Sequence, residues 1–476
     1  MSAPLSRRRF AASLAAPALA AQSRPRPNIL LLLSDDHTAS FLGAYGDPVI
    51  QTPNFDRFAG QGMRFDRAFT AAPQCVPSRT ALLTGRSPVA CRMGRFSSPL
   101  PPDIVTLPEL LRPLGYYTGI CRRNFHLDGP AAGRADSVNE QLFERHGMRT
   151  FHRRVDFLDR NAPRAQTVAT VNRFLDRVPK SSPFFLWMGF NDPHHPWDSD
   201  AIPRPHDRAR LPIPRFLPDL PGVRDDLGRY YDEVGRMDEE FQWVLNILDE
   251  RQVAENTLVL FMGDNGMAFP HGKGSLYDPG LNVPLLVRWP GRVQPGASTT
   301  ELISGEDITP TLLEAAGTSV PDQMSGRSFL PLLEARAYQA RRHVFAARLP
   351  HGNSPFTEKT RANTFDLSRC VRSRRHKLIY NCTPQQIYAP VDSAAGPGWT
   401  EMTAAHHAGT LDPLLDRAYF TTPRPVIELY DLDGDPAELH NLAGRPEQAA
   451  TQRELLVALQ EKMILDYDFL PLPLSE

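Results

Sequence analysis

Two adjacent pairs of oxygen-bearing side chains have the chemistry to bind a metal ion together. Asp35 and Asp36 follow one continuous apolar stretch, and Asp264 and Asn265 follow another. Such stretches are typical of buried parallel strands, whose carboxyl ends form the ligand-binding edge of an open α/β sheet. Oxygen ligands without histidine or thiol favour a hard divalent cation, Ca²⁺ or Mg²⁺, over zinc. Each pair alone could be a helix cap or a turn, but their recurrence after two strands favours a metal site.

The sharpest local motif is C-x-P-S-R at residues 75–79, which contains Cys75 and Arg79. Alone it is weak, because a buried cysteine before a helix is an ordinary packing residue. It belongs, however, to a longer series of motifs. In chain order these are Asn-Ile-Leu with Asp-Asp (28–36), C-x-P-S-R, Gly115-Tyr116 through Arg123 and His126, Pro193-His194, Asp264-Asn265-Gly266, Lys273, Leu429-Tyr430-Asp431-Leu432, Asp435-Pro436 and Asn441-Leu442.

In this order and spacing the chain resembles the type I sulfatases of the alkaline-phosphatase-like superfamily, whose C-x-P-S-R cysteine is enzymatically oxidised to formylglycine. The resemblance covers residues 28 to about 442. It implies a calcium ion held by Asp35, Asp36, Asp264, Asn265 and the hydrated aldehyde of modified Cys75.

Sulfate ester hydrolysis explains why such residues belong together. The ester is an anion, so catalysis needs cations directed at its oxygens and a positioned nucleophile. An aldehyde hydrate carries two hydroxyls on one carbon: one attacks sulfur, and deprotonation of the other expels sulfate and restores the aldehyde. Serine or a thiol could not perform the second step.

The resemblance also assigns roles to the cationic side chains and histidines. Arg79 orients the hydrate, His126 takes its proton, His194 contacts sulfate or protonates the leaving group, and Lys273 binds sulfate near the leaving atom. Taken singly, each has an ordinary structural or surface interpretation, which we also favour for His195.

The chain departs from the family pattern at two places, one at Arg122-Arg123 and one beside Cys75. Arg122-Arg123 stands where the family commonly has Gly-Lys, so Arg123 takes the place of the lysine, and Arg122 raises the question of how closely this backbone approaches the site. Gln74 and Val76 are unusual beside the cysteine, but C-x-P-x-R is intact, and modification of Cys75 is still expected.

Two stretches, 266–280 and 230–238, are similar to the sulfamidases, which cleave the N-sulfate of glucosamine in heparan-type chains. They predict removal of sulfate from a terminal N-sulfoglucosamine, with exo action. The nearest alternative is a carbohydrate or aryl O-sulfatase. A phosphodiesterase of the same superfamily commonly has Thr or Ser as nucleophile and a second metal. An exported binding protein without catalysis would require an unmodified Cys75.

The elements that must position these residues alternate between strands and helices, which predicts an α/β fold. We expect a large mixed, mostly parallel sheet between helices, followed by a smaller C-terminal antiparallel sheet with a helix. The predicted strands are 28–33, 117–121, 183–190, 257–262, 369–372, 376–380 and 426–432, and the main predicted helices are 107–114, 164–178, 226–249 and 447–463. The predicted units are an export signal at 1–25, a catalytic domain at 26–350 and an α+β subdomain at 351–476, with long loops at 197–224 and 384–424.

The charge balance excludes two classes of partner. The 476 residues contain 53 Lys and Arg against 54 Asp and Glu, a net charge of −1. A binder of nucleic acid or of anionic membranes would be basic. No apolar run approaches the roughly 20 residues needed to span a bilayer. The resemblance to sulfatases implies a sulfated carbohydrate as the partner.

The first residues have the features of a bacterial export signal. Paired arginines within 6–10 precede an apolar run at 11–20 that ends in an Ala-x-Ala cleavage site. This order predicts export by the twin-arginine machinery to the periplasm, with a frayed Ala-rich helix as the alternative. A formylglycine-generating enzyme would be the second maturation partner.

Five cysteines are an odd number for an exported protein, which leaves at least one for chemistry. Beside Cys75, the other four allow three pairings. Cys370 and Cys382 flank a predicted hairpin and are the preferred pair over those that involve Cys91 and Cys121.

Overall fold

The computed structural model describes residues 25–93, 96, 99–123, 127–128, 137–351 and 365–473. The proposed export signal therefore lies outside the described residues, apart from Pro25, and so does His126. Within the described residues, no helix is both long enough and apolar enough to cross a membrane.

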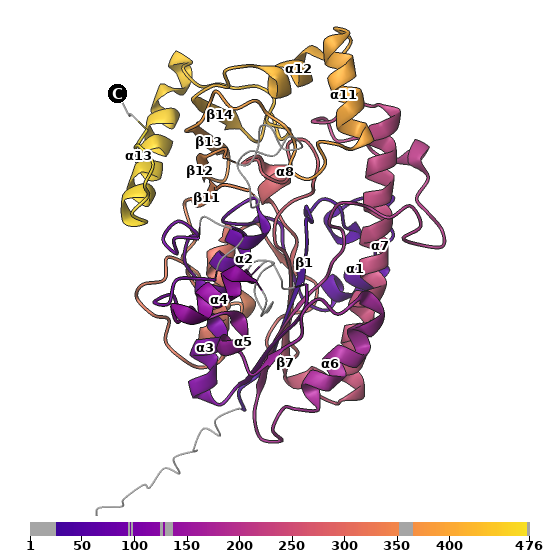
Figure 1. The fold of residues 1–476 in the computed structure, drawn as a ribbon, viewed down its shortest axis with the longest axis vertical. Coiled ribbons are helices and arrows are strands. Elements are labelled where there is room, and N and C mark those ends of the chain that lie inside the picture. Colours follow the sequence, from indigo (N-terminus) through magenta and orange to yellow (C-terminus); the bar gives the residue numbers. More distant parts are fainter. Residues whose placement is uncertain are drawn as a thin grey trace, which may run out of the picture.

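A mixed sheet of eight strands forms the centre of the molecule, in the order β5-β4-β6-β1-β7-β8-β2-β9 (Figure 1). Strands β5, β4, β6, β1 and β7 run parallel, β8 is antiparallel to β7 and β2, and β9 is parallel to β2. Their bounds are β1 Asn28–Ser34, β2 Met63–Phe65, β4 Tyr117–Arg122, β5 Phe157–Leu158, β6 Phe184–Gly189, β7 Thr257–Gly263, β8 Leu285–Arg288 and β9 Ala297–Thr299. A two-stranded sheet pairs β3 (Ala68–Phe69) with β10 (Ile303–Ser304).

The apolar sequence of β1 follows from burial on both faces of this sheet. Ile29, Leu31 and Leu33 lie in one hydrophobic cluster, and Leu30 and Leu32 in the other. Because alternate side chains of a strand point to opposite faces, a strand between two helical layers needs apolar residues at every position. The prediction of a buried parallel strand is confirmed.

Helices cover both faces of the large sheet (Figure 1). On one side lie α1 (Pro53–Gly60), α6 (Thr167–Leu175) and the long α7 (Pro221–Glu250). On the other lie α2 (Cys75–Thr84), α3 (Leu107–Leu111), α4 (Val138–Arg145) and α5 (Phe151–Arg154). The apolar residues that recur at three and four along α7 are buried, which confirms the helix expected there. Shorter helices are α8 (Asp278–Leu281), α9 (Ile308–Ala315) and α10 (Leu330–Leu333).

The C-terminal part forms a second, antiparallel sheet in the order β11-β12-β13-β14. Its strands are β11 Val344–Arg348, β12 Ser368–Arg372, β13 His376–Asn381 and β14 Ile427–Asp431. Helix α13 (Ala449–Leu465) packs on one face, and residues of the large domain such as Phe69 and Leu281 pack on the other. The expected fold class is thus confirmed. Because β11 begins at Val344, the small sheet starts before residue 351; the domain boundary itself stays a prediction.

Two expectations for this C-terminal part are wrong. Residues 384–424 contain two helices, α11 (Pro397–His407) and α12 (Pro413–Phe420), each with proline in its first turn. Cys370 and Cys382 are free thiols, as are the other three cysteines. Cys370 is opposite Ile379 in the β12–β13 register, three residues from Cys382, too far along the ladder for a disulfide.

Candidate active site

Four neighbouring strands of the large sheet, β4, β6, β1 and β7, end at the same level, and predicted site residues follow them in the chain. In the ladder, Ser34 of β1 is level with Gly263 of β7, and both Leu33 of β1 and Arg122 of β4 are level with Gly189 of β6. The parallel direction brings the segments after these strands to the same sheet edge. The structure thereby gathers Asp35, Asp36, Arg123, His194, Asp264 and Asn265.

The acidic residues at this edge are completely buried. The Asp36 amide donates to Asp264 Oδ1 at 3.0 Å, and Asn265 Nδ2 donates to Asp36 Oδ1 at 2.8 Å. Burial raises the pKa of Asp36 to about 6 and that of Asp264 to about 7. Adjacent carboxylates away from water repel one another, and a bound cation offsets this repulsion.

The donor set fits a hard metal ion. Asn265 Oδ1 is buried and has no hydrogen-bond partner among the described residues, so it is available as a ligand. Asp35, Asp36, Cys75 and His194 each offer an atom, all within 4.8 Å of one another. His194 in this group was not among the expected ligands.

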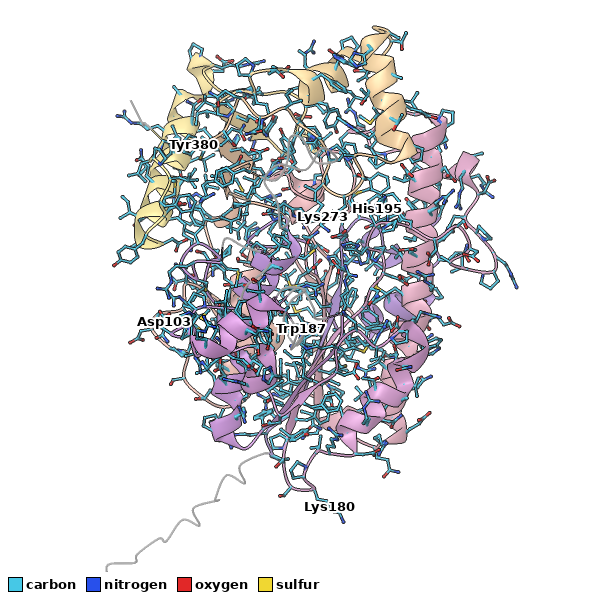
Figure 2. The ribbon with its side chains drawn as sticks, viewed as in Figure 1. Asp103, Lys180, Trp187, His195, Lys273 and Tyr380 are labelled. Carbon is cyan, nitrogen blue, oxygen red and sulfur yellow. The ribbon has the colours of Figure 1, made fainter. Side chains whose placement is uncertain are left out.

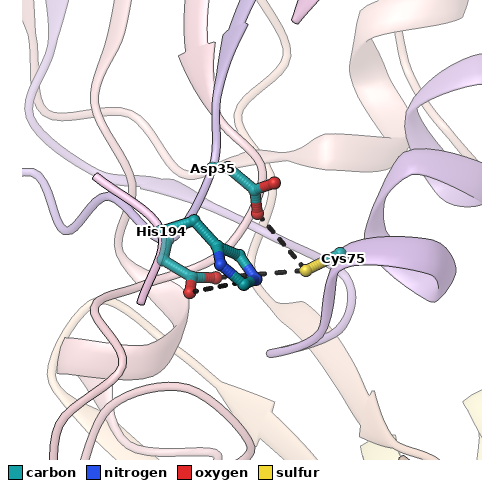
Figure 3. A group of neighbouring side chains, drawn as sticks. Asp35, Cys75 and His194 are labelled. Atoms are coloured by element: carbon teal, nitrogen blue, oxygen red, sulfur yellow. Dashed lines mark hydrogen bonds and ion pairs between the residues drawn. The ribbon is translucent and has the colours of Figure 1, made fainter. Parts of the chain in front are cut away.

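Cys75 is the first residue of α2 and lies against these carboxylates. Its Sγ is 3.4 Å from Asp35 Oδ1 and 3.9 Å from Asp36 Oδ1, with His194 nearby (Figure 3). Burial, and then Asp35, raise the pKa of the thiol well above its usual value. The unmodified side chain is therefore a protonated thiol and a poor nucleophile at neutral pH.

Arg79 holds two of the carboxylates from the same helix. Its Nε donates to Asp264 Oδ2 at 2.9 Å, its Nη2 is 3.1 Å from Asp35 Oδ2, and its Nη1 donates to the Arg123 carbonyl at 3.0 Å. Burial opposes its charge, but Asp35 and Asp264 raise its pKa. Arg123 adds a bond from Nε to Asp35 Oδ2 at 2.6 Å. The two arginines thus neutralise and orient carboxylates.

Lys273 is buried between the large domain and the small sheet (Figure 2). Its Nζ lies 2.8 Å from Asp36 Oδ1, 2.6 Å from Asp392 Oδ2 and 3.3 Å from His194 Nε2. Burial lowers the pKa of Lys273, but Asp36 and Asp392 outweigh it and raise this pKa. Burial, and then Lys273, lower the pKa of His194 to about 3, so its ring is neutral at neutral pH.

A family model described as "Sulfatase" matches residues 27–318. The chain belongs to the sulfatase family. A second model, described as "N-sulphoglucosamine sulphohydrolase, C-terminal", matches residues 269–417. These matches make the chain a sulfatase, which hydrolyses sulfate from sulfated sugars.

Three similar proteins represent the range of its relatives. The human N-sulphoglucosamine sulphohydrolase is 31% identical over 93% of this chain and 90% of its own length. An ulvan-active sulfatase of Formosa agariphila is 28% identical over 95% of this chain and 77% of its own. A protein solved with its substrate D-glucosamine-2-N,6-O-disulfate has the same fold, with a TM-score of 0.67 and 19% identity over 93% of this chain and 99% of its own.

The two departures of this sulfatase from the family pattern have structural explanations. Arg122 has φ +64°, the left-handed conformation that favours glycine, and its side chain is directed to Glu240 of α7, with Nη2 2.7 Å from Oε1. Gln74 binds Leu349, just after β11, through both ends of its amide: Oε1 accepts from the Leu349 amide at 2.9 Å, and Nε2 donates to its carbonyl at 2.8 Å. Gln74 therefore joins the cysteine turn to the small sheet.

Asp392, whose carboxylate is the second one beside the Lys273 ammonium, carries no signal in the sequence. Asp392 adopts φ +67° in a segment that the sequence marked only as polar and rich in proline. Its Oδ1 is 3.7 Å from His351 Nε2, and its Oδ2 is 3.8 Å from His194 Nε2. No strand end or recognised motif precedes it, so only the fold brings it to the site. His195 packs edge-on against Trp197, which agrees with a structural interpretation.

Proposed function

We propose that this sulfatase removes the N-sulfate of a terminal N-sulfoglucosamine in heparin- or heparan-type chains. The observation that carries the proposal is the match of the N-sulphoglucosamine sulphohydrolase C-terminal model to residues 269–417. That range supplies both Lys273 and Asp392, which touch each other at the site. The human relative, similar over nearly the whole length of both chains, supports the same substrate class.

The nucleophile in this proposal comes from Cys75 after oxidation to formylglycine by a formylglycine-generating enzyme. The hydrated aldehyde supplies a hydroxyl that the buried thiol lacks. Its neighbour Asp35 is fixed by Arg79 and Arg123, and this fixed geometry lowers the entropic cost of bringing the reacting atoms together. Export to the periplasm would accompany this maturation.

A calcium ion, or Mg²⁺ in its place, would be held by Asp35, Asp36, Asp264, Asn265 and modified Cys75. The ion would supply positive charge at the sulfate oxygens. The unpartnered Asn265 Oδ1 and the raised pKa values of Asp36 and Asp264 support this assignment.

Lys273 and His194 would act on the sulfate and the leaving group. The Lys273 ammonium carries a fixed charge and would bind a sulfate oxygen. His194 Nε2, 3.3 Å from Lys273 Nζ, would accept from the ammonium, so the neutral ring would carry its proton on Nδ1 and give a hydrogen bond to the leaving nitrogen from there. His126, outside the described residues, stays the predicted base.

A carbohydrate O-sulfatase is the second candidate, and the ulvan-active relative favours it. That relative is similar over 95% of this chain at 28% identity, close to the value for the human relative. The catalytic residues would be the same for a sulfate ester and a sulfamate, because the same sulfate group is transferred from either substrate.

The deciding assay offers N-sulfoglucosamine, glucosamine 6-O-sulfate and an aryl sulfate in parallel, and measures released sulfate. N-sulfoglucosamine should give the largest kcat/KM. A heparin oligosaccharide N-sulfated at both the end and interior sugars should lose only the terminal N-sulfate. A wide preference for either ester would reject the N-sulfatase while retaining the sulfatase.

A further inference from the structure

A second cavity lies between the small sheet and α12, separate from the carboxylates of the active site. Its volume is about 370 Å³, within the range of small-molecule sites. The segment Ser275 to Tyr277, close after Lys273 in the chain, forms part of its wall, and none of the metal-site carboxylates lines it. Figure 1 shows α8, which follows this segment, beside the small sheet.

Two arginines at this cavity have guanidinium donors without a hydrogen-bond partner among the described residues. Arg348 ends β11, and only 3% of its side chain is exposed. Its Nη1 lies 3.0 Å from Asp366 Oδ2, but its Nε and Nη2 have no hydrogen-bond partner among the described residues. Arg424 donates from Nη2 to Asp366 Oδ1 at 2.5 Å and to the Thr383 carbonyl at 3.2 Å, while its Nε has none. Within the described part of the chain, three buried guanidinium nitrogens therefore have no hydrogen-bond acceptor.

Other groups already bind or neutralise the acidic side chains of the cavity. Glu428 accepts from Tyr277, Tyr430 and Asn381 at 2.8, 2.7 and 2.5 Å. Glu438 Oε1 is 2.7 Å from the Lys377 ammonium.

The charge of the lining is also unbalanced. Two further arginines, the exposed Arg417 and Arg445, line the cavity, so four arginines stand against the two glutamates. Burial lowers the pKa of Arg348, and Asp366 offsets this only in part. Buried cationic donors without acceptors are costly in a native protein. An anionic ligand would remove this cost.

We propose that this cavity is a second binding site, which takes an oxyanion: a sulfate or carboxylate group, free or carried by a sugar. Arginine forks match the paired oxygens of such groups. The rings of Tyr277, Tyr388 and Tyr430 form part of the wall that an attached sugar would contact. The site is independent of the sulfate ester that undergoes hydrolysis, and goes beyond the proposed function.

The test, which rests on the proposed function for the first of the two sites, titrates N-sulfoglucosamine by calorimetry into Cys75→Ala protein, which cannot turn the sugar over. Two binding events per chain are expected, and Arg348→Gln in this background should weaken one of them about ten-fold. Arg453→Gln, an exposed residue of α13 outside the cavity, is the matched control and should leave both unchanged. With Cys75 intact, Arg348→Gln should retain aryl sulfate turnover.

Further probes identify the source of the oxyanion. Inorganic sulfate that binds the cavity as tightly as the sulfated sugar indicates a free anion, and tighter binding of glucosamine 6-O-sulfate or glucuronic acid indicates an anionic sugar. Should Arg348→Gln fail to fold, Arg424→Gln replaces it with the same expectation. The proposal is overturned if the Cys75→Ala protein shows a single binding event, or if the cavity variant that folds, Arg348→Gln or Arg424→Gln, has no effect. Equal displacement of the bound sugar by uncharged N-acetylglucosamine overturns it as well.

Discussion

At the scale of single residues, the proposed chemistry depends on the state of Cys75. Its thiol is buried against Asp35, and its pKa is raised. The side chain is therefore a protonated thiol at neutral pH and a poor nucleophile. We predict that protein produced beside a formylglycine-generating enzyme carries an aldehyde at this position, and that Cys75→Ala abolishes turnover. Mass spectrometry of the Cys75 peptide measures the conversion. Cys75→Ser should trap a sulfate ester, and an unmodified thiol in fully active protein would contradict the mechanism.

Asp392 provides a test of how Lys273 is held. The ammonium lies between Asp36 and Asp392, so Asp392→Asn removes one of two negative charges that compete with sulfate for it. We expect inorganic sulfate to inhibit the variant several-fold more strongly, while kcat falls about ten-fold because Lys273 loses its position. Steady-state kinetics with sulfate as inhibitor measures both.

The matched control for Asp392 is Asp200→Asn, which changes an exposed aspartate. It should leave kcat and sulfate inhibition unchanged. A purely structural role for Asp392 would lower the amount of folded enzyme without changing the inhibition constant, and that result would contradict the assignment.

The contrast between Asp36 and Asp392 shows what sequence can predict about a site. Asp36 follows an apolar strand directly, so its place at the sheet edge was predictable from local pattern. Asp392 reaches Lys273 from a loop more than a hundred residues away. Its position depends on how the small sheet packs against the large domain, which no local pattern encodes.

At the scale of elements, Arg122 ties the end of β4 to α7. It combines a left-handed backbone with an ion pair to Glu240, and both side chains are buried. Arg122→Gly relieves about 1 kcal/mol of backbone strain but leaves Glu240 without its nearest cation, at a cost of about 3 kcal/mol. We predict a net loss of about 2 kcal/mol in the free energy of unfolding, measured by denaturant titration.

The second variant for this pair is Arg122→Gly combined with Glu240→Gln. It removes the buried charge and should recover most of the lost stability. If Arg122→Gly alone is as stable as the parent, the ion pair does not hold these elements together.

Elements with a clear apolar period were predictable, and those fixed by long-range packing were not. The heptad-like spacing in α7 identified it, whereas the region of α11 and α12 is polar and punctuated by proline. There, the prolines predict loops, whereas in the structure they open α11 and α12, because proline is favoured in the first turn of a helix. The predicted disulfide is also wrong. The strand register places Cys370 opposite Ile379 and away from Cys382.

At the scale of the whole molecule, the active site forms where the two sheets meet. The large sheet supplies the carboxylates, and the segment after β13 supplies Asp392 for Lys273. Gln74, directly before Cys75, binds the backbone just after β11. The small sheet and its loops are therefore a structural part of the candidate active site, and truncation before β11 would remove both contacts.

Metal removal should act on this whole assembly, because the proposed ligands come from β1, β7 and α2. An ion that binds only the folded protein adds about 2.7 kcal/mol to the free energy of unfolding at a hundred-fold excess over its Kd. We predict that EDTA lowers Tm by roughly 5 °C and abolishes activity, and that Ca²⁺ or Mg²⁺ restores both. A zinc-selective chelator should have no effect.

Asp264→Ala should lose the Ca²⁺-dependent rise in Tm, whereas Asp322→Ala, at an exposed position, should keep it. Stoichiometric zinc in fully active protein, or a Tm of Asp264→Ala that still rises with Ca²⁺, would show that the ion binds elsewhere.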